Sequence, residues 1–149
     1  MIVEHLRKVS RNKLDSGYWS ILSLNSLLGQ LSTFQKTQLL GMMETRQFQL
    51  GETLFGAGQP ASHIYLLENG QVELHTKGQQ GVKLGAGALL GAVHNEPSMP
   101  IHKASAVALE STRCLAFPWE GIRSFMLSNP GFFIRMLRIH EDPPLEAVL

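Results

Sequence analysis

Histidine can ligate a metal or transfer a proton, and this chain has six of them. None belongs to an H-E-x-x-H or H-x-H motif, the spacings that bring two imidazoles to one metal ion. His94, Glu96 and His102 are the candidates for the His and Glu cluster that a metalloenzyme on a β-barrel would use. Because isolated histidines are weak metal signals, we expect these three to be loop residues and predict no metal site.

Nucleophile motifs point the same way. Cys114 stands in an apolar run, which favours a buried, unreactive thiol over a catalytic one. No serine lies in a G-x-S-x-G turn, the motif that exposes a serine nucleophile in many hydrolases. We therefore predict no catalytic residues and a protein that is not an enzyme.

A glycine-rich segment, Leu84 to Ala92, is the strongest sign of ligand chemistry. It follows a strand-like run and brings unhindered backbone amides close together, an arrangement that can hold a phosphate. The alternative is a tight turn between two strands. His102 and Lys103, a short distance further on, could contribute positive charge to a phosphate site.

Composition excludes several classes of protein. Thirteen Lys and Arg balance 12 Asp and Glu among 149 residues, so the basic excess of a nucleic-acid-binding domain is missing. The single cysteine excludes an intrachain disulfide and fits a reducing compartment. No apolar run reaches the roughly 20 residues of a membrane span, and the N-terminus lacks the order of a signal peptide. These features predict one cytoplasmic domain with a sizeable core.

Helical patterns stand at the beginning of the chain. Residues 4–24 carry apolar side chains at loosely helical spacing, including Tyr18, Trp19, Ile21 and Leu22. Ser32 and Gln35 then match a capping box, which satisfies two free backbone donors at a helix start. An apolar stripe follows it, consisting of Phe34, Leu39, Leu40 and Met43.

From about Thr45 the pattern changes to short strand-like runs separated by glycines. Asn69-Gly70 is the strongest two-residue hairpin signal, and a second turn follows between Lys77 and Gly81. Many short strands at such spacing favour a β-sandwich or barrel. We expect the alternating apolar residues to point into the barrel, namely Ile64, Leu66, Val72, Leu74, Leu84, Val107, Leu115 and Phe117.

Helical patterns return after Pro118, where Ile122, Phe125 and Met126 form one apolar face. Asn129-Pro130 separates this helix from a last one that is expected to end by His140. The predicted organisation is an N-terminal helical segment (1–30), a mainly β domain (31–140) and a C-terminal tail (141–149).

The order of residues from Leu28 to Pro130 resembles a cyclic nucleotide-binding domain of bacterial catabolite-activator regulators and kinase regulatory subunits. The matching pieces are Leu50 to Ala61, Ile64 to Leu74, Leu84 to Gly91, and Ala104 to Ala108. This resemblance implies a fold that is mainly β with flanking helices: an eight-stranded jelly-roll barrel with helices at both its N- and C-terminal ends.

The resemblance also identifies the ligand cassette, with Gly91, Ala92, His102, Lys103 and Ala104 as its candidate binding residues. In the family a glutamate after the glycine accepts the ribose 2′-hydroxyl, and a later arginine pairs with the cyclic phosphate. Here Ala92 and His102 occupy those positions. An alanine accepts no hydrogen bond, and a neutral histidine lacks the bidentate fork of arginine.

The resulting hypothesis is a non-enzymatic regulatory or interaction module with an atypical pocket and no cofactor. It would engage a protein partner, or self-associate, through its helices. Direct DNA binding is not expected, because no recognition helix follows the barrel. The alternatives are a genuine cyclic nucleotide sensor (cyclic AMP, cyclic GMP or cyclic di-GMP) that uses Lys103 or His102 for the phosphate, and a cupin-type metalloenzyme. Met99, Pro100 and Ile101 could also fill the pocket with apolar side chains.

Overall fold

The structure is a computed structural model that describes residues 18–94, 98–141 and 147–148. Most of the predicted N-terminal segment and of the C-terminal tail lies outside these residues. The elements are three segments before the strands, the strands themselves, and two helices with a short strand after them: α2 (Tyr18–Leu24), η1 (Leu28–Gln30), α3 (Thr33–Met42), β1 (Glu44–Phe48), β2 (Thr53–Phe55), β3 (His63–Asn69), β4 (Val72–Thr76), β5 (Val82–Leu84), β6 (Leu89–Leu90), β7 (Ala104–Ala108), β8 (Thr112–Pro118), α4 (Trp119–Ser128), α5 (Pro130–Glu141) and β9 (Ala147–Val148).

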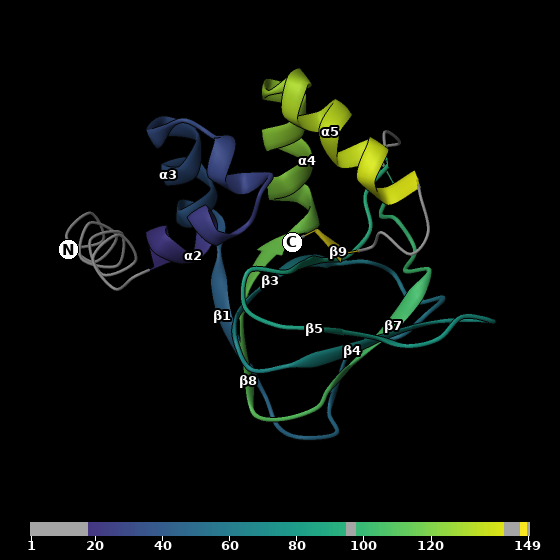
Figure 1. Ribbon diagram of the computed structural model, residues 1–149. Coiled ribbons are helices and arrows are strands. Elements are labelled where there is room, and N and C mark those ends of the chain that lie inside the picture. Colours follow the sequence, from purple (N-terminus) through teal and green to yellow (C-terminus); the bar gives the residue numbers. More distant parts are fainter. Residues whose placement is uncertain (1–17, 95–97, 142–146, 149) are drawn as a thin grey trace, which may run out of the picture.

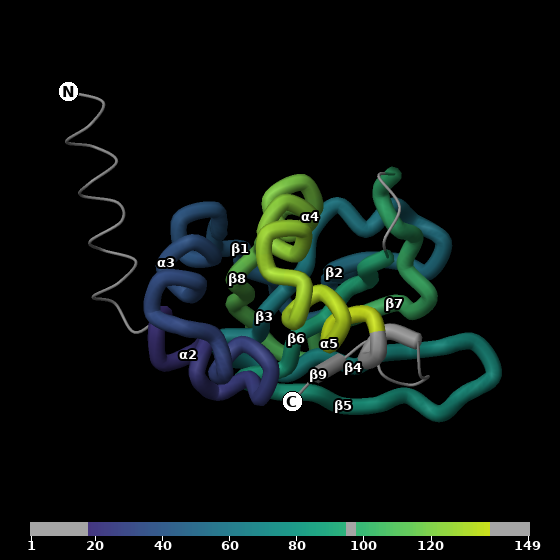
Figure 2. Tube along the Cα trace, turned by 90° about the horizontal axis from the view of Figure 1, so that it is seen from above, coloured from purple at the N-terminus to yellow at the C-terminus, as the bar shows by residue number. Residues whose placement is uncertain are grey.

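The strands form two antiparallel sheets that face each other, with strand orders β1-β8-β3-β6-β9 and β2-β7-β4-β5. The predicted jelly roll is confirmed, and the helices lie together on one side of it (Figure 1). Strand β9 adds to the edge of β6 within the stretch that had been predicted as a tail. Seen from above, the helices cover the sheet of β1, β3 and β8, while the β4–β5 hairpin extends beyond them (Figure 2). None of the helices among the described residues has the length and apolarity to cross a membrane.

Helix α3 starts at the predicted capping box. The Ser32 hydroxyl accepts from the backbone N–H of Gln35 (3.1 Å), and the Gln35 side chain accepts from the backbone N–H of Ser32 (2.8 Å). Leu39 and Leu40 are buried as expected, but Phe34 is 71% exposed. The prediction for Phe34 was wrong because Phe34, five and six residues before Leu39 and Leu40, lies on a different face of the helix.

The C-terminal helices follow the predicted pattern closely. Ile122, Phe125 and Met126 are all buried on α4. Asn129 ends this helix, and its side chain donates to the carbonyl of Phe125 (2.7 Å) while accepting from the Gln35 side chain (2.6 Å). The break between the two helices is therefore tied to the start of α3.

The predicted hairpin at Asn69-Gly70 is wrong. Strand β3 pairs with β6 and β8, whereas β4 pairs with β5 and β7, so the turn passes from one sheet to the other. Gly70 does have the positive φ (94°) that the signal implies. A glycine with positive φ can reverse the chain in a hairpin or in a turn between two sheets. Only the pairing with distant strands distinguishes the two cases.

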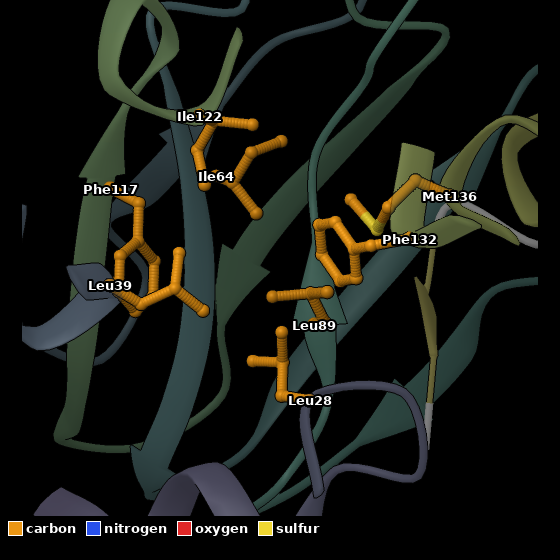
Figure 3. A pocket seen from close by; sticks show the side chains of 8 residues that line it. All are labelled: Leu28, Leu39, Ile64, Leu89, Phe117, Ile122, Phe132 and Met136. Carbon is orange, nitrogen blue, oxygen red and sulfur yellow. The ribbon is translucent and has the colours of Figure 1, made fainter. Parts of the chain in front are cut away.

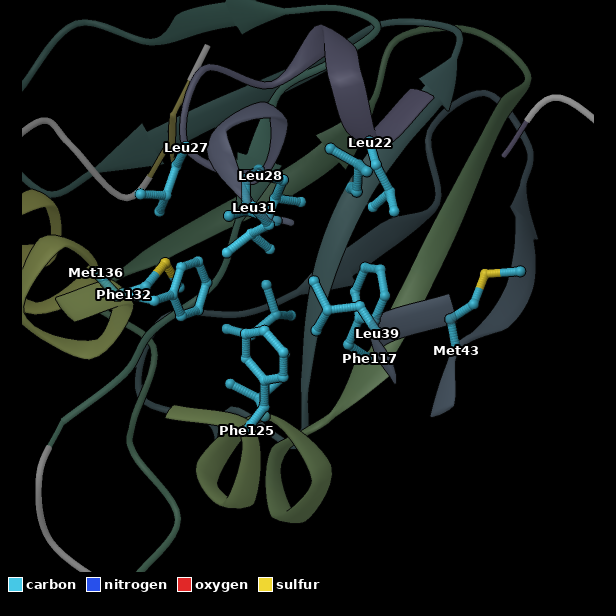
Figure 4. Packing of buried hydrophobic residues seen from close by; sticks show 14 of the residues in the cluster. Leu22, Leu27, Leu28, Leu31, Leu39, Met43, Phe117, Phe125, Phe132 and Met136 are labelled. Atoms are coloured by element: carbon cyan, nitrogen blue, oxygen red, sulfur yellow. The ribbon is translucent and has the colours of Figure 1, made fainter. Parts of the chain in front are cut away.

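Two apolar cores lie on the two sides of the β1–β8–β3 sheet. The larger one packs the helices against the outer face of this sheet (Figure 4) and consists of large side chains, among them Leu22, Leu28, Leu39, Phe117, Phe125 and Met136. The other core lies between the sheets and contains mainly small and aliphatic residues, with Phe55 and Tyr65 as its aromatics. Because both faces of β3 and β8 are buried, these two strands are apolar on both sides, whereas the edge strand β1 is mostly polar.

The expected inward residues divide between the two cores. Val72, Leu74 and Leu84 point between the sheets, as predicted. Ile64, Leu66, Leu115 and Phe117 are buried, but against the helices on the opposite face. Val107 is only half-buried, because Ala104, Ala106 and Ala108 are the inward residues of β7. Alternation defines two faces of a strand, and it cannot identify the inner one when helices cover the outer one.

Candidate functional site

The cassette connects β6 to β7. Gly91 has φ 144°, and a Cβ atom at this position would lie 2.7 Å from the Cδ1 atom of Ile64. The backbone conformation therefore favours glycine here, and a side chain would also require the end of the Ile64 side chain to shift. Ala92, at the position of the family's glutamate, is only 6% exposed. This part of the cassette thus keeps the family's glycine and offers a buried methyl group in place of a carboxylate.

His102 occupies the position of the family's arginine and is only 3% exposed. Its imidazole stacks on the ring of Phe55, with ring centroids 3.8 Å apart and planes 8° from parallel. Its backbone N–H donates to the carbonyl of Gln59 (2.9 Å), and its carbonyl accepts from the N–H of Gly58 (2.8 Å). The histidine is therefore held between the β2–β3 loop and the aromatic side chain.

The imidazole of His102 carries no charge at neutral pH. Burial lowers its pKa to about 4, from an ordinary value of 6.5. Its Nδ1 atom is buried and has no hydrogen-bond partner within the described parts of the chain. A neutral ring supplies neither the charge nor the paired N–H donors with which arginine binds a phosphate.

The remaining cassette candidates alternate in exposure. Lys103 is exposed, whereas Ala104 is fully buried in the core between the sheets. His102 and Ala104 therefore face the interior, and Lys103 faces away from it. The structure does not bring the lysine together with Ala92 or His102 on one surface of the cassette.

The proposed filling of the pocket by the loop's apolar residues is wrong for two of the three. Met99 is 40% exposed and Ile101 is 51% exposed, and only Pro100 is buried. The interior is filled instead by Phe55, by Tyr65 and by strand residues such as Leu90. The rings of Phe55 and Tyr65 lie 6.1 Å apart and 18° from parallel, which continues the stack that begins at His102.

The metal candidates do not meet in the described residues. Glu96 lies outside them, His94 packs against Trp119 (ring centroids 5.6 Å apart), and His102 stacks on Phe55. Over residues 18–94 and 98–141, no three His, Cys, Asp or Glu side chains gather as metal ligands would. Cys114 is buried as predicted, and burial raises the pKa of its thiol to about 12.

A polar cluster at the rim of the sheet escaped the sequence analysis. It joins Glu44 and Arg46 of β1 to His63 and Tyr65 of β3, with Ser62 beside them. Arg46 donates to Glu44 through Nε (3.1 Å) and Nη2 (2.7 Å), and to the Tyr65 hydroxyl through Nη1 (3.1 Å). The spacing Glu44-x-Arg46 puts both side chains on one face of a strand, but it does not reveal their partners.

Charge and burial shift the pKa values in this rim cluster. Arg46 lowers the pKa of the Glu44 carboxyl through hydrogen bonding and its positive charge. Burial, followed by the charge of Arg46, lowers the pKa of His63. Burial raises the pKa of the Tyr65 hydroxyl. At neutral pH the cluster therefore holds one carboxylate, one guanidinium, a neutral imidazole and a neutral phenol.

A separate apolar gap lies between the helices and the outer face of the β3–β8 sheet (Figure 3). All eight side chains around it are apolar: Leu28, Leu39, Ile64, Leu89, Phe117, Ile122, Phe132 and Met136. Without a polar group this gap cannot recognise a ribose or a phosphate. It belongs to the packing of the helices and not to the cassette.

Comparisons with known proteins agree with this architecture. The sequence model of a family described as "cyclic nucleotide-binding domain" matches residues 45–129, which is more than half of the chain. A putative potassium channel protein of Rhodopseudomonas palustris is 24% identical over 127 residues, covering 83% of this chain but only 30% of the channel protein.

Solved structures show the same fold at low sequence identity. A regulatory subunit of a cAMP-independent protein kinase A from Trypanosoma cruzi, bound to guanosine, has a TM-score of 0.69 and 20% identity over 93% of this chain and 48% of its own. A putative cyclic nucleotide-binding protein from Geobacter metallireducens has a TM-score of 0.64 and 20% identity over 78% of this chain and 87% of its own. These likenesses establish the architecture and leave the ligand open.

Proposed function

Because the chain belongs to the cyclic nucleotide-binding domain family, we propose that it is a non-enzymatic regulatory or interaction module whose pocket does not bind a cyclic nucleotide in the family's manner. The observation that carries the proposal is the state of His102. At the position of the family's arginine stands a buried, neutral ring that stacks on Phe55. A phosphate placed there would meet no positive charge.

The two missing contacts would account for a large part of the binding free energy of a small ligand. A charge-assisted hydrogen bond contributes roughly 1.5 to 3 kcal/mol. Losing the carboxylate at Ala92 and the guanidinium at His102 therefore lowers affinity by about two to four orders of magnitude. Burial of both positions adds to this, since a ligand would have to displace packed side chains to reach them.

Isothermal titration of the purified protein tests the proposal. The panel consists of cyclic AMP, cyclic GMP and cyclic di-GMP, with guanosine added because one structural relative is bound to it. We expect no saturable heat from the three cyclic nucleotides at up to millimolar ligand. Micromolar binding of any of them would refute the proposal.

Family membership itself supports a second candidate, a genuine cyclic nucleotide sensor that contacts the phosphate through Lys103 or His102. This candidate requires Lys103 to turn inward or His102 to become protonated inside the core. Lys103→Ala and His102→Gln are the variants that distinguish it: each would weaken cyclic nucleotide binding in a sensor. In the proposed module neither changes the titration, because the unmodified protein already gives no binding.

The helices are the proposed surface for a protein partner or a second copy of the chain. Leu22 is fully buried, and Tyr18, Trp19 and Ile21 are partly buried against the same core, so α2 packs mainly on its own domain. Other helical side chains remain exposed, namely Phe34 (71%), Leu127 (55%) and Ile134 (52%). Light scattering of the protein and of Phe34→Ser would reveal self-association and its dependence on this surface.

A further inference from the structure

The rim cluster lies on the inner face of its sheet, outside the cassette. Arg46 pairs in register with Cys114, and Glu44 with Ala116. Both β8 partners belong to the core between the sheets, and directly paired residues share a face. Arg46 therefore points toward the inner side, where it meets Tyr65, yet it remains 37% exposed at the rim.

Glu44 occupies this cluster as an internal anion. One of its oxygens, Oε1, lies 2.7 Å from Nη2 and 3.1 Å from Nε of Arg46, and 3.4 Å from Nε2 of His63. Two N–H groups of the guanidinium thus converge on one carboxylate oxygen, and the same pair of donors can bind two oxygens of a carboxylate or phosphate. The carboxylate itself is 55% exposed, so it can leave for water.

Other polar side chains contact Arg46 or lie one hydrogen bond away from it. Arg46 can only donate, so Nε2 of His63, 3.2 Å from Nη2, is an acceptor and its Nδ1–H donates to the Ser62 hydroxyl (2.9 Å). The hydroxyls of Ser62 and Tyr65 each accept one hydrogen bond and keep a proton that they can donate. Besides the carboxylate, the side chains of His63 and Tyr65 therefore contact the guanidinium, while Ser62 contacts the far side of the His63 ring.

We propose that Arg46, with the hydroxyl of Tyr65, forms a binding site for an oxyanion, the phosphate or carboxylate group of a small ligand, which takes the place of Glu44. An exposed ion pair contributes little to stability in water, so releasing Glu44 is easily offset by a ligand. A phosphate offers more acceptor oxygens than Glu44, so it can accept from the Tyr65 hydroxyl as well as from the guanidinium.

A second arginine on the same sheet, Arg113, has similar partners to Arg46 and allows the two to be compared. Arg113 contacts Glu68 (3.1 Å) and the hydroxyl of Tyr18 (2.9 Å), which also gives an Arg, Glu and Tyr set. At Arg113, however, the tyrosine belongs to helix α2, and the Glu68 side chain is only 19% exposed. Within the described part of the chain, Arg113 has no histidine contact like that of Arg46 with His63. Arg113 is therefore a matched control, with similar exposure (41% against 37%) but a structural role.

The test follows binding of inorganic phosphate by nuclear magnetic resonance, using signals of His63 and Tyr65 as reporters. Wild type should show saturable shifts in the millimolar range. Glu44→Gln removes the competing charge while keeping the side chain's size, and should bind phosphate about tenfold more tightly. Arg46→Gln should abolish the shifts, whereas Arg113→Gln should leave them unchanged. Acetate and succinate, titrated in the same way, distinguish a carboxylate site from a phosphate site.

Two results would overturn the proposal: no saturable shift in wild type or Glu44→Gln with any of the three anions, or equal shifts in Arg46→Gln and wild type. If Glu44→Gln does not fold, as judged by circular dichroism, the comparison of wild type with Arg46→Gln and Arg113→Gln decides alone. The oxyanion site shares no residue with the cassette, so a negative result here would leave the proposed function unaffected.

Discussion

The segment Leu50 to Leu74 and the cassette Gly91 to Ala104 differ in what they retain of the family pattern. In the first, Gly51, Gly58 and Gly70 all have the positive φ that their turns require (86°, 87° and 94°). The cassette also keeps its glycine, but its two ligand-contacting positions hold a buried alanine and a buried neutral histidine.

The difference separates the requirements of folding from those of binding. A turn glycine is needed for the chain to pass between strands, whatever ligand is present. A carboxylate and a guanidinium are needed only for ribose and phosphate, and burying them without a ligand is unfavourable. The cassette therefore combines the family's glycine at Gly91 with side chains at Ala92 and His102 that suit a packed interior.

The largest effect is expected in the scaffold. Leu66→Ala should lower the free energy of unfolding by ~2 to 5 kcal/mol, through lost burial and a cavity against the helices. Val107→Ala, at a half-buried position facing away from the core, should cost under ~1 kcal/mol. Urea denaturation of both variants measures the difference. Equal losses would mean that the faces of β3 and β7 are assigned wrongly.

The next largest effect is expected at the turn glycines Gly70 and Gly58, because Gly70 is crowded and Gly58 is not. Gly70→Ala should cost roughly 2 to 4 kcal/mol, because the residue has positive φ and its new methyl group would lie 2.7 Å from the carbonyl oxygen of Ser111. Gly58→Ala meets nothing within 4 Å and should cost only the backbone strain, about 1 to 2 kcal/mol. Thermal melts of the pair would show whether crowding or φ dominates, and a larger loss for Gly58→Ala would contradict the packing around Gly70.

Restoring the family's side chains should harm the protein. In the double variant Ala92→Glu with His102→Arg, two charges enter positions that are 6% and 3% exposed. We expect a loss of about 3 kcal/mol, from desolvation of these charges. Melting the variant with and without millimolar cyclic AMP checks this. A ligand-induced rise in Tm would instead show a pocket that lacked only these two groups.

The smallest expected effect is the dependence of stability on pH. The pKa of His102 is about 4 when folded and ordinarily 6.5, so the unfolded chain binds a proton first as pH falls. The contribution of His102 to the free energy of unfolding is therefore fully present above pH 6.5 and is lost as the pH falls toward 4. Between pH 7 and 5 the loss is about 2 kcal/mol. His102→Phe keeps the ring stack and should flatten that part of the curve. Identical pH profiles for the variant and wild type would mean that His102 titrates normally.

Local signals in the sequence predicted local structure well. The capping box at Ser32 and the apolar face of Ile122, Phe125 and Met126 are present as expected. The ligand-binding role of the cassette positions stays a prediction, because it rests on the resemblance that runs through Gly91 and Ala104. What Ala92 and His102 lack was visible from residue type alone.

Features that depend on distant strands were not predictable in this way. Whether the turn at Gly70 is a hairpin depends on the sheet that β4 joins. Whether Leu66 faces the helices or the interior between the sheets depends on how the helices pack on β3. Arg46 reaches Tyr65 across the intervening strand β8, a contact that no spacing along the chain records. The stacking of His102 on Phe55, which sets its pKa through burial, depends on the same long-range packing.

The pKa of the His102 imidazole, measured by ¹⁵N nuclear magnetic resonance with and without millimolar cyclic AMP, tests the central claim most directly. A buried ring stacked on Phe55 should titrate at about 4, and cyclic AMP should not change this value, because no phosphate approaches the ring. A pKa near or above 6.5 that rises further with cyclic AMP would contradict the account, since it would place a protonated His102 against a bound phosphate.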